Sequence, residues 1–156
     1  MATAEGRTIP FVGPEAIERR LGRPLRARIG ANESAFGPAQ SVITAMQQAA
    51  SGVWQYCDPE IYDLRTALSR HLRIPTANIC VGEGIDGLHG LIARLVIEPG
   101  DVAVTSLGAY PTFAYHIRGF GGHIHAVPYR DDHEDLAALA DTARRERARV
   151  VYLANP

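Results

Sequence analysis

Short apolar runs that alternate with amphipathic stretches limit the folds open to this chain more than any other feature. Apolar character predicts strands over residues 79–81, 102–106, 123–129 and 149–153. Helices are predicted between them, over 85–96, over 136–147 and in a segment that ends near Gly119. Strands and helices in this alternation are typical of a mostly parallel sheet flanked by helices. We therefore predict an α/β fold.

The first part of the chain is predicted to be helical. Helices are expected over 14–21 and 41–50, each with apolar residues at helical spacing. A third helix should follow Asp58-Pro59 and bury one face, made of Ile61, Leu64, Leu68 and Leu72.

Composition narrows the class of partner. The net charge of −1 offers no basic excess for a nucleic acid. The longest apolar-rich stretch, 88–97, is interrupted by charged and small residues and is too short to span a bilayer. Cys57 and Cys80 form no CxxC pair, which favours a reduced setting. We expect a soluble cytoplasmic protein with no nucleic-acid or membrane partner.

All sixteen residues in the Lys+Arg total are arginine. A chain without lysine has no Walker A phosphate loop, no lysine Schiff base and no lysine general base.

The segment ICVGEGIDG, residues 79–87, predicts a strand, a glycine turn and the start of a helix. Backbone N–H groups at a helix start can hold an anion, and here Gly84, Ile85 and Asp86 would supply them. Asp86 could also cap the helix. Two interpretations stay open, phosphate binding or a turn that needs glycine for its geometry alone. The glycine spacing is too short to favour a dinucleotide fingerprint.

Two aromatic residues are candidates for the same end of the sheet. Phe113, in LGAYPTFAY, follows the second strand and could lie against a planar ring. Tyr56 precedes a predicted helix, where its phenol could donate to an anion. Taken singly, each is better explained by a structural role, as a core or interface aromatic for Phe113 and as a turn tyrosine for Tyr56. His123 and His125 share a strand face, but no third ligand completes a set, so no metal is predicted.

Taken in order, the motifs NESAFGP, QYCDPEIYDLRTAL, ICVGEGIDG, EPGD, YPTF and VYLANP resemble the class I/II aminotransferases, and histidinol-phosphate aminotransferase-like members in particular. The resemblance covers roughly residues 25–156. It implies a homodimeric enzyme of fold type I that uses pyridoxal phosphate to transaminate amino acids and 2-oxo acids. Residues 1–37 would form an N-terminal arm, and residues 38–156 an incomplete large domain.

The resemblance also implies roles for individual residues. The backbone at Gly84, Ile85 and Asp86 would hold the cofactor phosphate, and Phe113 would stack on the pyridine ring. Tyr56 would reach the phosphate in the neighbouring subunit's site. Asn32 would lie near the substrate entrance.

Several positions depart from the family pattern. Glu83 and Ile85 stand where small polar residues are usual, Gly87 where glutamate is usual, and Cys57 where proline is common. Asn155 is not expected to be the asparagine that contacts the cofactor, since that residue directly precedes PTG in the family.

The family's Schiff-base lysine, together with its aspartate, tyrosine and arginine, would come after the last residue of this sequence. We therefore expect a fragment that is inactive alone and prone to aggregate, because the strand at 79–81 would lack its neighbour. The alternative is a non-catalytic domain that acts through dimerisation or by binding a phosphate ligand weakly.

Overall fold

A computed structural model of the chain describes residues 12–30 and 33–154. The chain divides into two compact units, Met1–Pro59 and Glu60–Pro156. The predicted sheet and the glycine turn both lie in the second unit.

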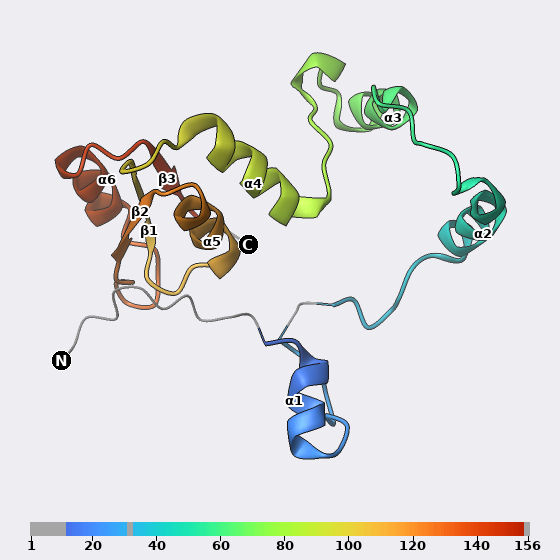
Figure 1. Cartoon of the computed structure of the whole chain (residues 1–156), viewed down its shortest axis with the longest axis horizontal. Helices are drawn as coiled ribbons and strands as arrows, with labels where there is room; N and C mark the ends of the chain where they lie inside the picture. Colours follow the sequence, from blue (N-terminus) through green and yellow to red (C-terminus); the bar gives the residue numbers. More distant parts are fainter. Residues whose placement is uncertain (1–11, 31–32, 155–156) are drawn as a thin grey trace. The chain divides into compact units, whose positions relative to one another are not determined.

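The sheet has three parallel strands (Figure 1), β1 (Val102–Ser106), β2 (His123–Val127) and β3 (Val150–Tyr152). Their order is β2-β1-β3, and Thr105 of β1 is in register with Tyr152 of β3. The carboxyl ends of β1 and β3 therefore lie side by side. This arrangement confirms the predicted α/β fold with a parallel sheet.

Helices cover both faces of the sheet. They are α4 (Gly84–Val96), α5 (Pro111–Gly119) and α6 (Leu136–Arg145). Successive residues of β1 point to opposite faces. Ala103 packs in one core cluster with α4 and α5 residues, whereas Val104 packs in another with a residue of α6. Thus α4 and α5 lie on one face and α6 on the other.

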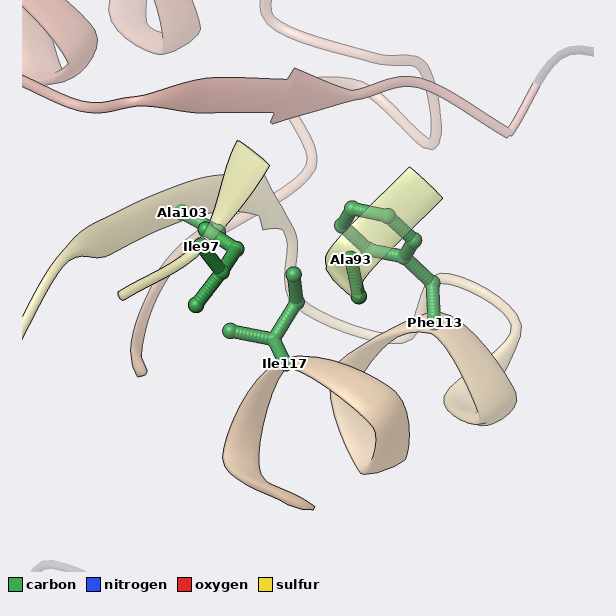
Figure 2. Packing of buried hydrophobic residues seen from close by; sticks show 5 residues of the cluster. All are labelled: Ala93, Ile97, Ala103, Phe113 and Ile117. Atoms are coloured by element: carbon green, nitrogen blue, oxygen red, sulfur yellow. The ribbon is translucent and has the colours of Figure 1, made fainter. Parts of the chain in front are cut away.

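The core on the α4–α5 side is small and closely packed (Figure 2). Ile97 of the α4 C-cap and Ile117 of α5 meet there over Ala103. Gly122, just before β2, lies against both isoleucines, and an added Cβ would come within 2.8 Å of Ile117 and 2.9 Å of Ile97. A side chain at residue 122 would therefore separate the turn from the core.

The strand predicted over 79–81 is not formed among the described residues. Ile79 has extended dihedral angles, φ −114° and ψ 116°, but the segment pairs with no strand. A strand needs a neighbour to receive its backbone hydrogen bonds, and apolar sequence alone does not provide one. The predicted strand over 123–129 is also shortened, ending before Pro128, which has no N–H to donate to a ladder.

The remaining helices lie earlier in the chain. They are α1 (Pro14–Leu21), α2 (Gln40–Ala49) and α3 (Tyr62–Leu72), with 3-10 turns η1 (Ala50–Gly52) and η2 (Thr76–Asn78). All three α-helices agree with the predicted positions. The predicted buried face of α3 is wrong, however, because Leu64 and Leu72 are about half exposed and no residue of this helix is buried. Periodicity indicates which face is apolar, but not whether another element covers it.

Candidate functional site

The start of α4 lies in the predicted glycine turn. Gly84 has φ +73°, in the left-handed region that favours glycine, and the space where its Cβ would lie is open. Glu83 occupies the N-cap position and makes no capping bond with its side chain. The first N–H groups of a helix have no acceptor within the helix. Ile85 and Asp86 thus present uncapped N–H groups at the positive end of α4.

Two details differ from the predicted geometry. The Gly84 N–H donates to the Gly82 carbonyl at 2.8 Å, so it is already engaged. Asp86 does not cap the helix, because it lies two residues inside the first turn and Glu83 holds the cap position. Glycine and aspartate in a turn do not reveal which residue becomes the cap, so the predicted cap at Asp86 is wrong.

Phe113 belongs to a cluster of three rings, one of which comes from α4. Its ring stacks on Tyr152, with centroids 4.5 Å apart and planes 21° from parallel. His89 of α4 meets both rings edge-on, at 5.5 Å and 79° from Phe113 and at 5.2 Å and 80° from Tyr152. Phe113 is only 2% exposed. The structure therefore brings together α4, α5 and β3 through aromatic side chains.

Burial sets the ionisation of this cluster. Loss of water around the imidazole lowers the pKa of His89, with nearby His116 acting in the same direction and Asp86 opposing. Burial raises the pKa of the Tyr152 phenol, and the charges of Asp86 and Tyr110 add to that effect. The buried His89 and the partly buried Tyr152 thus both favour their neutral forms.

Several polar atoms on this side of the sheet have no hydrogen-bond partner among the described residues. They are Nδ1 of His89 and the hydroxyls of Thr105 and Thr112. Thr105 points to the same face as Ala103, because side chains alternate along a strand. Buried polar atoms normally have a partner, which can be ordered water or a bound ligand.

The structure gives fewer contacts for the other predicted site residues. Ile85 is 61% exposed and its side chain has no polar atom, so only its backbone N–H is suited to holding an anion. Tyr56 is fully exposed and belongs to the first unit, whereas the glycine turn belongs to the second. Asn32 lies outside the described residues.

His89 and Tyr152 were not predicted from sequence to belong to the site. A signal was available for each. His89 follows Asp86 by three residues and so shares its helix face. Tyr152 follows Val150 by two residues and so points to the same face of the sheet.

Elsewhere, a cavity of about 550 Å³ lies on the α6 side of the sheet, lined in part by Pro128, Thr142 and Arg145. It contains none of the predicted site residues and opens widely to solvent. Within residues 12–30 and 33–154, no group of three His, Cys, Asp or Glu side chains could hold a metal ion. No helix in that part of the chain is long and apolar enough to cross a membrane.

Comparison with known proteins identifies the family. Residues 28–156 match the model for aminotransferase class I and II. A histidinol-phosphate aminotransferase of Moorella thermoacetica is 31% identical over 148 residues, covering 95% of this chain and 38% of that protein. An aromatic amino acid aminotransferase of Thermobifida fusca is 37% identical over 135 residues, covering 83% of this chain and 36% of its own length.

A solved structure extends the similarity to the fold. Histidinol-phosphate aminotransferase from Sinorhizobium meliloti, in complex with pyridoxal-5'-phosphate, is 57% identical with a TM-score of 0.89. The alignment covers 99% of this chain and 43% of that one, so this chain spans less than half the length of the relatives it matches. The family match includes the glycine turn, Phe113 and Tyr152, and the chain belongs to the class I and II aminotransferases.

Proposed function

We propose that this chain provides part of the pyridoxal-phosphate site of an amino-acid transaminase. The observation that carries the proposal is the uncapped start of α4, with the open Gly84 turn, next to the aromatic cluster of Phe113. The solved relative with pyridoxal-5'-phosphate and the family membership support the same cofactor.

The described residues are better suited to binding the phosphate group of pyridoxal phosphate than its pyridine ring. The N–H groups of Ile85 and Asp86 suit an anion, since helix starts bind phosphate without any cationic side chain. The Phe113 ring is almost fully covered, and one of its faces lies on Tyr152. Stacking of Phe113 on the cofactor therefore requires the Tyr152 side chain to turn away, while the Phe113 ring keeps its plane.

Each residue has a limited role in the proposed chemistry. When bound, pyridoxal phosphate supplies the electron sink for transamination. Ile85 and Asp86 fix its phosphate through their N–H groups, with the Gly84 turn giving close access. Phe113 excludes water from one side of the ring. None of the 156 residues is lysine, so we propose that this chain alone does not transaminate.

Substrate and assembly are proposed at the level that the family supports. The substrates are an amino acid and a 2-oxo acid, with histidinol phosphate favoured by the names of the similar proteins. The protein acts as a cytoplasmic homodimer, in which Tyr56 reaches the phosphate of the neighbouring site and Asn32 lies near the substrate entrance. The full exposure of Tyr56 supports a contact outside its own unit.

A matched pair of glycine substitutions tests phosphate binding. Gly84 and Gly100 both have positive φ, +73° and +93°, and open space at the Cβ position. Gly84→Ala and Gly100→Ala should therefore cost a similar amount of stability, about 1 kcal/mol. Only Gly84→Ala should reorient the first N–H groups of α4. We expect it to weaken pyridoxal-phosphate binding roughly tenfold, as expected for the loss of one charge-assisted hydrogen bond.

Binding would be measured by quenching of protein fluorescence, with pyridoxal as the ligand that lacks phosphate. Pyridoxal should bind weakly to both variants and to the parent. Equal affinity of the parent for pyridoxal and pyridoxal phosphate would contradict the assignment of Ile85 and Asp86. No response to either ligand would favour a second candidate, a non-catalytic domain that acts through protein contacts. The exposed apolar side chains of the first unit favour that candidate.

A further inference from the structure

His89 is a buried polar residue that the proposed function does not use. It is 6% exposed, and its Nδ1 atom has no hydrogen-bond partner among the described residues. Burying a polar group without a partner destabilises a fold. An aliphatic residue would fill the same interior position of α4 without that cost. The imidazole must therefore offer something that an aliphatic side chain does not.

The contacts of the ring show what it offers. Phe113 and Tyr152 stack on each other, and the His89 ring lies nearly perpendicular to both, with interplanar angles of 79° and 80°. Edge-to-face contacts depend on a flat ring, because the positive ring edge is directed at a negative ring face. A branched aliphatic side chain of similar volume would touch both rings but could not direct their planes.

The three rings come from segments that meet at the carboxyl end of the sheet. His89 lies one turn after Asp86 in α4, Phe113 lies in the first turn of α5, and Tyr152 ends β3. The same helix that presents the uncapped N–H groups thus also holds the ring that contacts Phe113. A shift of the ring cluster would move Phe113 relative to those N–H groups.

We propose that His89 is a positioning residue, whose flat ring sets the plane of Phe113 next to the start of α4, so that Phe113 is already oriented for the cofactor when Tyr152 turns away. This inference rests on the proposed function for its link to the cofactor. The ring-setting role itself does not depend on any ligand, and the two parts can be tested separately.

Two apolar substitutions of His89 separate the effect of a planar ring from the effect of an apolar side chain. His89→Phe keeps a planar edge and removes the unpartnered nitrogen, whereas His89→Leu keeps an apolar side chain and removes the plane. The first experiment uses the full chain without cofactor and records near-ultraviolet circular dichroism from the tyrosine and phenylalanine rings. We expect the parent and His89→Phe to give the same spectrum, and His89→Leu to lose part of the tyrosine signal. Leu95→Ala, at an 83% exposed position of the same helix, serves as the control.

The second experiment measures the dissociation constants of pyridoxal phosphate and of inorganic phosphate. His89→Leu should bind pyridoxal phosphate roughly three- to tenfold more weakly, the range given by one lost edge-to-face contact. Its affinity for inorganic phosphate should equal that of the parent, because the N–H groups of α4 are untouched. His89→Phe should match the parent for both ligands. If His89 had a purely structural role, His89→Leu and His89→Phe would change the stability of the chain. His89→Leu would then not weaken pyridoxal-phosphate binding selectively over phosphate binding.

The outcomes separate the two proposals. If the parent fails to bind pyridoxal phosphate, the proposed function is wrong, and the dichroism still decides whether His89 sets the rings. If His89→Leu keeps the tyrosine signal of the parent, or binds pyridoxal phosphate as tightly, His89 is not a positioning residue. If His89→Leu does not fold, His89→Met takes its place, since methionine is also apolar and has no plane.

Discussion

His89 shows at the residue scale how burial can make stability depend on pH. Its pKa in the folded chain lies below the usual 6.5, chiefly because of burial, with His116 lowering it further and Asp86 opposing. The unfolded chain therefore binds this proton more readily than the folded chain. By linkage, the contribution of His89 to stability is fully present above pH 6.5 and is lost as the pH falls toward the folded pKa.

The expected result is a lower free energy of unfolding at about pH 5.5 than at about pH 7.5, since that interval contains the ordinary histidine pKa. Urea unfolding of the parent and of His89→Phe at both pH values measures this difference in the free energy of unfolding. The decrease should be smaller in His89→Phe, which has no proton to bind at this position. Leu95→Ala, which truncates an exposed side chain of the same helix, should keep the decrease of the parent. An identical decrease in His89→Phe and the parent would show that His89 does not carry the effect.

At the scale of elements, α6 owes its start to a single cap. The Asp135 carboxylate accepts a hydrogen bond from the Ala138 N–H at 2.9 Å, which satisfies one of the free donors of the first turn. Asp135→Ala should lower the free energy of unfolding by about 1 kcal/mol, and Asp135→Asn should retain most of it. Asp141→Ala is the matched control, since Asp141 lies in the same helix and pairs with Arg144 on the surface. Such exposed pairs contribute about 0.5 kcal/mol or less. Equal losses in both alanine variants would argue against the cap.

The same scale shows what sequence could predict and what it could not. The strand Val102–Ser106 matches its predicted range, because its apolar run lies between a Pro-Gly turn and a glycine loop and has partners on both sides. The segment 79–81 has the same apolar character and forms no strand. A strand needs an adjacent strand for its backbone hydrogen bonds, and the sequence of the segment itself does not reveal whether there is one. In the site, the glycine turn before the helix could be predicted from its glycines. The lack of a side-chain cap and the engagement of the Gly84 N–H by Gly82 could not, since both depend on local dihedral angles.

At the scale of the whole molecule, the first unit exposes large apolar side chains. None of its described residues, 12–30 and 33–59, is buried. Phe36 is 99% exposed and Trp54 is 80% exposed. A unit with no buried residue leaves these large apolar side chains without cover, which favours their burial against another chain. Together with the unpaired segment 79–81, this surface predicts that the 156-residue chain does not remain a monomer.

Sedimentation velocity over a range of concentrations measures the association. We expect dimers or larger species whose fraction rises with concentration. Full burial of one large apolar side chain contributes about 2 kcal/mol, so Phe36→Ser combined with Trp54→Gln should weaken association by at least roughly tenfold. Gln47→Ser, at an exposed polar position of α2, should leave association unchanged. A monodisperse monomer with one sharp thermal transition would instead mean that the first unit covers these side chains within the chain itself. The dimer proposed for the cofactor site would then lose its support from Tyr56.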